Sequence, residues 1–243
     1  MSEKKKLVPK RRFKEFENAD PWEQRKLEDI GNSMSGTSIE SEFSSKGIFK
    51  VISIGSYSEN STYVDQKIRA KKSEKTLNRV LNSGDLTMIL NDKTSSGRII
   101  GRVLLIKRDG VFVYNQRTQR ISPNREEFNS TFLYQLLNAK EIRKKIINES
   151  QGNTQIYVNW SRIKKIDYLF PNIKEQKELG EFFAKIDNLI TLHQRAHLTI
   201  YYKGVVKWLI KLEKPTYLLI IILNGLKFIK KALLEKLRCQ NIE

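Results

Sequence analysis

The sequence is short of the features that would point to a membrane, to secretion or to disulfide chemistry. It has one cysteine, Cys239, which excludes an intramolecular disulfide and a zinc site built from cysteines and is typical of a reducing cytosol. Its strongest apolar run, Tyr217 to Leu223, covers seven residues, whereas a bilayer span needs about 20. The charged N-terminus is followed by no apolar core of a secretory signal. We therefore expect a cytoplasmic protein that does not enter a membrane.

Motifs that carry catalysis are missing as well. The sequence has no GxxxxGK[ST] phosphate loop, no Asn-Pro-Pro-aromatic motif of amino-methyltransferases and no glycine-rich methyl-donor loop. His193 and His197 have the spacing of a metal pair, but no HExxH glutamate or third ligand is evident. Asp167 with Glu175 and Lys177 only loosely imitates a nuclease, because Glu175 is better explained as part of a helix cap. We expect no catalytic residue, metal or cofactor on this chain.

Acidic side chains are scarce relative to basic ones. The 243 residues include 45 Lys and Arg against 27 Asp and Glu, which gives a formal net charge of +18. Such a field attracts a polyanion and speeds encounter with it, so nucleic acid is the leading expected partner. The alternative is a solvated, lysine-rich surface with no such partner, since net charge alone does not identify one.

The order of patterns along the chain predicts an α+β fold, with a mixed-sheet domain followed by a long helical arm. Residues 1–20 contain seven Lys or Arg without periodicity, which predicts a flexible basic leader. In WEQRKLEDIG, Leu27 and Ile30 stand at helical spacing behind Asp20 and Pro21, which predicts a short opening helix. This helix would begin a domain over residues 21–170.

Within that domain, β-branched and aromatic runs separated by Gly, Asn, Asp and Ser predict strands in residues 48–55, 85–90, 98–106 and 110–116. A helical pattern follows over residues 128–147. Its expected apolar face consists of Phe132, Leu133, Leu136, Leu137 and Ile142. We expect this helix to pack on the sheet.

The arm is predicted over residues 171–243, where Asn172 caps a helix and Glu175 reaches back to it. Apolar residues then alternate by four and three, which is the seam of a coiled coil. The seam comprises Leu179, Phe183, Ile186, Ile190, His193, His197 and Ile200. Gly204 and Pro215 predict an irregular stretch around 201–224. Up to Ile200 the arm would extend about 40 Å at 1.5 Å per residue.

Several phrases of the sequence, taken together, resemble a known family. They are WEQRKLEDIG, GDLTMILNDKTSSGRIIGRVLLI, VYNQRTQRISP and SQGNTQIYVNWSRIKKIDYLFPNIKEQKELGEFFAKIDNLITLHQR. In this order they resemble the DNA-specificity subunit of type I restriction-modification systems, over about residues 20 to 195. Residues 196–224 depart from the family's pattern, which affects the expected length and continuity of the arm.

The resemblance implies a non-catalytic protein that reads DNA sequence for other subunits. Family members usually carry two target-recognition domains, each followed by a helix, whereas this chain has one such unit. The resemblance implies methyltransferase subunits and a restriction subunit as partners, and it assigns S-adenosylmethionine, ATP and magnesium to them. A single unit is open to several readings: a half-subunit that dimerises, one part of a split pair, or a truncated or rearranged product. Symmetric pairing would predict a bipartite, inverted-repeat DNA site.

Three polar stretches, beginning at Asn91, Asn115 and Gly152, and a fourth at Ser35 to Ser38 hold side chains suited to reading bases. Arginine can bond guanine O6 and N7, and asparagine or glutamine can pair with adenine N6 and N7. The candidates for base contacts are Asn91, Lys93, Thr94, Arg98, Asn115, Gln116, Arg117, Gln119, Arg120, Asn153 and Gln155. The candidates for phosphate contacts are Arg102, Arg162, Lys164 and Lys165. For each, the alternative is a polar side chain that simply faces solvent. The rival functions are a coiled-coil interaction module with incidental charge, a standalone nuclease, and an inactive fragment.

Overall fold

The computed structural model describes residue 9 and residues 12–210, with side chains described as far as residue 192. The chain divides into two units between residues 181 and 182. We call the first unit, which ends at residue 181, the head, and the second unit the arm. Each is described by itself.

A four-stranded antiparallel sheet forms the centre of the head. Its order is β2 (Gly31–Ser35), β9 (Thr118–Pro123), β5 (Leu86–Ile89) and β7 (Val103–Leu105). Successive side chains of a strand point to opposite faces. Leu86 and Met88 accordingly enter one core cluster, whereas Ile89 enters another on the opposite face. Both faces of this sheet are therefore covered, which explains why all four residues of β5 are buried.

Two consecutive helices, α2 (Ser130–Asn138) and α3 (Lys140–Asn148), pack on the first face. The predicted helix is divided at Ala139, whose backbone is extended at φ −61° and ψ 141°. The predicted apolar face is nevertheless confirmed, because Phe132, Leu133 and Leu137 are buried and Leu136 and Ile142 pack against the same cluster. The short α4 (Trp160–Ile163) adds Ile163 to this core.

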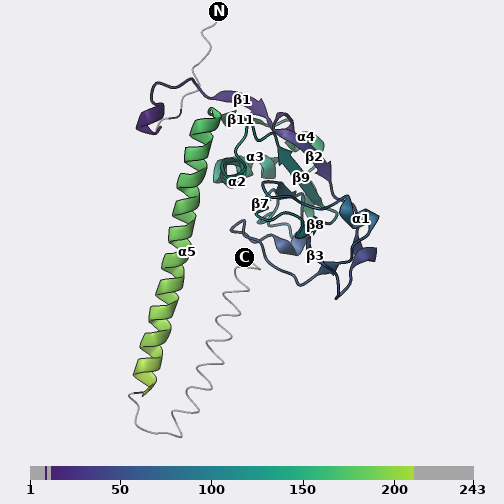
Figure 1. The fold of residues 1–243 in the computed structure, drawn as a ribbon, viewed down its shortest axis with the longest axis vertical. Helices are drawn as coiled ribbons and strands as arrows, with labels where there is room; N and C mark the ends of the chain where they lie inside the picture. Colours follow the sequence, from purple (N-terminus) through teal and green to yellow (C-terminus); the bar gives the residue numbers. More distant parts are fainter. Residues whose placement is uncertain (1–8, 10–11, 211–243) are drawn as a thin grey trace, which may run out of the picture. The chain divides into compact units, whose positions relative to one another are not determined.

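A three-stranded sheet covers the other face, in the order β4 (Arg69–Ala70), β3 (Phe49–Ile52) and β8 (Phe112–Tyr114). β3 pairs antiparallel with β4 and parallel with β8, so this sheet is mixed as predicted. In Figure 1, α2 and α3 lie on one side of β9 and β7, and β3 and β8 lie on the other. A one-turn helix, α1 (Glu74–Leu77), and the 3-10 turns η3 (Glu40–Glu42) and η4 (Ile54–Ser56) complete the loops of this layer.

Two pairs of short strands join segments that are far apart in the sequence. β6 (Asn91–Asp92) pairs with β10 (Ile156–Tyr157), and β1 (Glu23–Lys26) pairs with β11 (Asp167–Phe170). The predicted opening helix is therefore wrong. The spacing of Leu27 and Ile30 reflects the single 3-10 turn η2 (Leu27–Asp29), which buries both side chains. Pairing of β1 with a distant strand outweighs the local helical pattern.

The predicted flexible leader is also wrong for residues 12–20. The guanidinium of Arg12 donates to both carboxylate oxygens of Glu175, at 2.8 and 2.5 Å, with side-chain exposures of 4% and 1%. Arg12 also donates to the carbonyls of Ala19 and Asp20, and a 3-10 turn, η1 (Lys14–Phe16), lies between. The strong ion pair raises the pKa of Arg12, chiefly through its hydrogen bond to Glu175. This segment is anchored to the head.

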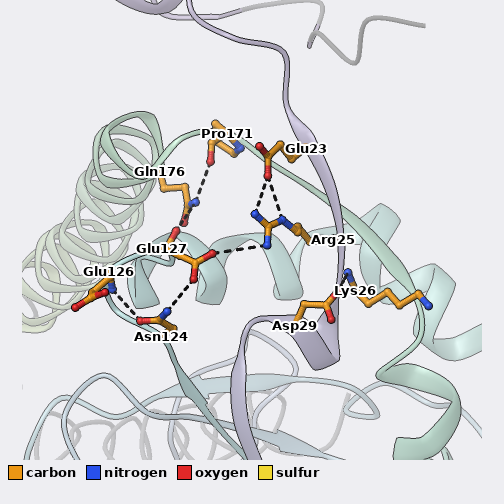
Figure 2. A network of polar contacts seen from close by, with 9 residues as sticks. All are labelled: Glu23, Arg25, Lys26, Asp29, Asn124, Glu126, Glu127, Pro171 and Gln176. Carbon is orange, nitrogen blue, oxygen red and sulfur yellow. Dashed lines mark hydrogen bonds and ion pairs between the residues drawn. The ribbon is translucent and has the colours of Figure 1, made fainter. Parts of the chain in front are cut away.

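The first turns of α5 (Ile173–Ile210) belong to the head and are held by polar contacts. Asn172 Oδ1 accepts from the Glu175 amide at 3.0 Å, so the predicted capping residue is confirmed. The side chain of Glu175 does not complete a capping box, because it pairs with Arg12. Gln176, which is buried, donates to the carbonyls of Glu127 and Pro171 (Figure 2) and accepts from the Asn129 amide. We call this set of contacts the junction.

The arm consists of the rest of α5 as far as the described residues extend. Of the predicted seam, Leu179 lies in the head and packs against its core, whereas Phe183 and Ile190 are exposed and Ile186 is half-buried. The side chains of His193, His197 and Ile200, and the predicted irregular stretch from residue 211 onward, lie outside the description. A continuous helix passes residues 201–210. The coiled coil stays a prediction.

Candidate nucleic-acid interface

A cavity of about 400 Å³ brings together members of the polar stretches that begin at Asn91, Asn115 and Gly152, but none of Ser35 to Ser38. Its wall includes Asn91 and Lys93 from the first, Asn115, Gln116 and Arg117 from the second, and Gln155 from the third. The apolar part of the lining comes from Phe43, Ile54 and Ile68. The pairing of β6 with β10 places the first and third stretches side by side. The cavity is thus bordered by amide and cationic side chains, which are the groups that read base edges, and also by the carboxylates of Glu40 and Asp92.

Arg117 occupies the turn between β8 and β9 in a strained backbone conformation. Its φ of 69° lies in the left-handed region, which residues other than glycine rarely adopt. The carbonyl of Arg117 accepts from the Leu90 amide at 2.9 Å, so the turn is tied to the end of β5. In the orientation that pairs both groups of its amide, Asn91 accepts a 2.9 Å hydrogen bond from Arg117 Nη1. The structure thus holds an exposed guanidinium at the cavity by a strained turn.

Two other members of this stretch are buried. Gln119 is 1% exposed, and its Oε1 accepts from Ser35 Oγ at 2.7 Å. Asn115 is also buried, and its Oδ1 accepts from the Ile39 amide at 3.0 Å. Gln119 thus holds the end of β2, and Asn115 holds the backbone at Ile39 while it also borders the cavity. Their contacts with bases stay a prediction. Arg120 is half-buried on β9, a central strand of the four-stranded sheet.

The loop at residues 92–99, which follows β6, presents Lys93, Thr94 and Arg98 to solvent. The loop is closed from inside by the buried Asp92, whose carboxylate accepts from the amides of Thr94 and Ile99 at 2.9 and 3.1 Å. Thr94 Oγ1 donates to the same carboxylate at 2.9 Å. Arg98 forms a 3.5 Å ion pair with Glu59. We call this segment the 92–99 loop.

The third stretch is a turn in which Gly152 has a φ of 97°. A Cβ at Gly152 would lie 2.3 Å from the carbonyl oxygen of Gln155, so the turn requires glycine. Asn153 and Gln155 are both exposed, but only Gln155 borders the cavity.

The predicted phosphate contacts do not share one environment. Arg102 is half-buried and donates to Ser61 Oγ at 3.1 Å, and its burial lowers the pKa of its guanidinium. Arg162 and Lys164 are paired with Glu149 and Glu28 at 3.6 and 3.0 Å. Lys165 is exposed. Arg162 lies on α4, and Lys164 and Lys165 follow it. None of the three lines the cavity, so they would form a second basic patch.

Three residues at the interface were not singled out in the sequence. Glu40 borders the cavity and accepts from Gln116 Nε2 at 3.1 Å, which orients that amide. Asp92 closes the 92–99 loop, and the pattern Asp-x-Thr is a signal for such a turn. Arg143 donates to three carbonyl oxygens of the same loop region. Nothing in the sequence around Arg143 indicates this, because its partners are backbone groups.

Neither a metal centre nor a membrane span emerges from the part of the chain that the structure describes. Within residues 9 and 12–210, no group of three His, Cys, Asp or Glu side chains could hold a metal ion. No helix in that same part is long and apolar enough to cross a bilayer.

Head and cavity together define a DNA-specificity domain of the type I restriction-modification class. The chain belongs to that family, because the model of the type I restriction modification DNA specificity domain matches residues 19–200. It is similar to the type I restriction enzyme MjaVIII specificity subunit of Methanocaldococcus jannaschii, at 27% identity over 182 residues, which are 72% of this chain and 42% of that protein. The predicted family resemblance is thereby confirmed.

Solved structures show the same fold at low identity. The S subunit of a type I restriction-modification system from M. genitalium matches 91% of this chain and 53% of its own length, with a TM-score of 0.57 and 17% identity. The HsdS subunit from Thermoanaerobacter tengcongensis matches 72% of this chain and 39% of its own length, with a TM-score of 0.51 and 12% identity. The chain thus spans about half the length of the relatives that it matches.

Proposed function

We propose that this chain is a non-catalytic, sequence-specific DNA-binding subunit that directs partner enzymes to their target. The observation that carries the proposal is the cavity, where Asn91, Gln116, Arg117 and Gln155 converge from three separate stretches. Amide and guanidinium groups at one surface supply the donors and acceptors that discriminate base pairs in the major groove. The net charge of +18 supplies the attraction to phosphate that is independent of sequence.

The partners belong to the same proposal. Adenine methyltransferase subunits, and in some assemblies a restriction subunit, would bind the arm and the adjoining surface, and S-adenosylmethionine, ATP and magnesium would be held by those partners. The chain spans about half the length of its relatives. A reader with two recognition units would take the second from another copy, from a second half-subunit or from a longer chain. Two copies related by a two-fold axis would recognise a bipartite inverted repeat.

Binding-site selection from random duplexes tests the DNA part. The purified chain, alone and with a methyltransferase subunit, should enrich one sequence at moderate salt with competitor DNA present. A chain that enriches none in either state is an interaction module whose charge is incidental, or an inactive fragment, and the proposal fails. Cutting of plasmid with magnesium that is lost in Glu175→Ala would instead favour a nuclease.

The oligomeric part has separate tests. Size measurement of the chain, alone and with the methyltransferase subunit, distinguishes a dimer from a monomer that needs a second half. Methylome sequencing of cells with and without the gene should reveal a bipartite adenine-methylation motif that depends on it. A single undivided, asymmetric motif would exclude the symmetric dimer.

A further inference from the structure

We infer that Arg143 is a positioning residue that sets the sequence preference of the head without touching DNA. The inference rests on the proposed function and concerns the 92–99 loop. Arg143 lies on α3, which packs on the face of the central sheet away from β3 and β8. Nη2 of its guanidinium contacts the backbone of the loop.

The contacts of Arg143 determine which way the loop's backbone faces. Nη2 lies within hydrogen-bond distance of the carbonyl oxygens of Gly97, Arg98 and Ile100, at 3.3, 2.9 and 3.0 Å. These carbonyls are thereby turned inward. Of these three residues, Arg98 has an exposed side chain, whereas the side chain of Ile100 is fully buried.

Two further contacts complete the support of the loop from inside. The Asp92 carboxylate holds the amides of Thr94 and Ile99, so the loop's amides and carbonyls are bound by separate ionised groups. Gly97, with a φ of 65°, lies against Ile156, because a Cβ there would be 2.8 Å from that side chain. The loop is thus pre-organised before any DNA arrives, and pre-organisation lowers the entropy lost on binding.

The electrostatic environment of Arg143 indicates that the role of this residue is to hold the backbone of the 92–99 loop. It has no carboxylate within ion-pair distance among the described residues. Burial, with a smaller contribution from the nearby Arg102, lowers the pKa of its guanidinium to about 10. A cation in such a place is unfavourable unless its hydrogen bonds compensate. Three carbonyl dipoles, together with the attraction of the Asp92 and Glu59 carboxylates, are the compensation that the structure supplies, while Arg143 Nε is buried without a hydrogen-bond partner.

The test compares Arg143→Met with Lys144→Met, which removes the same charge from the neighbouring, exposed position of α3. The probes are the duplex recovered by selection with the unchanged chain and the same duplex with its bases permuted. In Arg143→Met, the ratio of the two affinities should fall at least tenfold, while the salt slope of binding stays the same. A direct phosphate contact would instead reduce the slope by about 0.9. Lys144→Met should keep the ratio.

Hydrogen exchange separates the inference from the proposed function. The amides of Thr94, Ile99 and Gly101 should exchange faster in Arg143→Met than in the unchanged chain. In Lys144→Met their exchange rates should stay the same. Arg143→Lys, which keeps the charge but not the planar guanidinium, should not restore the ratio. If Arg143→Met keeps the preference for the selected duplex, or if the amides of the loop exchange at the same rate in this variant, the inference about Arg143 is wrong and the proposed function is unaffected. An unchanged chain without any preference overturns the proposed function, and with it the role in specificity.

Discussion

Arg12 and Arg143 differ in what compensates each positive charge, and the difference separates the two working parts of the head. At the junction, Arg12 is paired with the carboxylate of Glu175, and its pKa is raised. Beside the 92–99 loop, the hydrogen bonds of Arg143 among the described residues all go to carbonyl oxygens, and its pKa is lowered by burial. An ion pair ties two chain segments strongly to each other. A guanidinium that binds carbonyls shapes one loop.

The two arginines differ because the junction and the 92–99 loop have different roles. The junction joins the start of the described chain to the first turn of α5, and a buried pair with two hydrogen bonds gives one defined geometry. On the proposed function, the loop presents its exposed side chains to an anionic ligand. The carboxylate of Asp92 is buried under the loop, where its oxygens are occupied by amides, whereas Glu59 remains beside Arg98 at 3.5 Å.

The largest expected effect is a loss of stability when Arg12, like Arg143, has no carboxylate as an ion-pair partner. Glu175→Gln replaces the buried carboxylate by a carbonyl and leaves Arg12 without its counter-charge. We expect the free energy of unfolding to fall by about 2–4 kcal/mol, because breaking a buried pair leaves an uncompensated charge. Urea unfolding followed by circular dichroism measures the loss, and Glu178→Gln on the exposed face of the same helix should leave the stability within about 0.5 kcal/mol.

A second variant checks that charge is the cause. Arg12→Met combined with Glu175→Gln removes both partners and should regain part of the stability lost by Glu175→Gln alone. Equal stability of Glu175→Gln and Glu178→Gln would show that the ion pair contributes little to the stability of the head. The proposed difference between Arg12 and Arg143 would then be wrong.

The next variant tests whether the junction depends on close fit as well as on charge. A Cβ at Gly180 would lie 2.8 Å from the amide nitrogen and 3.2 Å from the Cα of Phe132, so α5 passes the start of α2 at a distance only glycine permits. Gly180→Ala should destabilise the head by about 1–3 kcal/mol despite the higher helix propensity of alanine. Lys177→Ala, at an exposed position one turn earlier, is the matched control. A gain in stability for Gly180→Ala would exclude close packing there.

These expectations show where sequence reasoning succeeded and where it did not. The strands β3, β5 and β8 and the apolar face of α2 were predictable, because local alternation and helical spacing determine them. β1 was not, because its pairing partner lies far along the chain. The three polar stretches of the interface could be named from residue types, and the structure brings one or more members of each to one cavity.

What could not be predicted is which polar side chains turn inward. Gln119 and Arg117 look alike as candidates in NQRTQR, yet Gln119 lies on a central strand and Arg117 in a turn with positive φ. Arg143 carried no signal at all, because carbonyl oxygens are present in every residue that could have stood at positions 97, 98 and 100.

Variants of Arg117, which borders the cavity, test whether its strained backbone contributes to DNA recognition. Arg117→Gly removes the side chain and also relieves the left-handed conformation, whereas Arg117→Ala removes the side chain and keeps the strain. We expect glycine to exceed alanine in stability by about 1 kcal/mol. Both should weaken binding of the selected duplex by about tenfold, which is the lower end for a lost base contact. Unchanged affinity in both would exclude Arg117 from the contact surface.

The smallest effect on folding is expected for Lys165, an exposed cation in the second basic patch. Unlike the two arginines, it has no part in the fold, so Lys165→Gln should change the free energy of unfolding by less than about 0.5 kcal/mol. A phosphate contact would nevertheless appear as a salt slope reduced by about 0.9, with affinity lowered alike for the selected and permuted duplexes. Binding titrations at several salt concentrations measure both quantities. A slope that does not change would place Lys165 outside the DNA contact, and a changed ratio between the two duplexes would show that this patch also reads sequence.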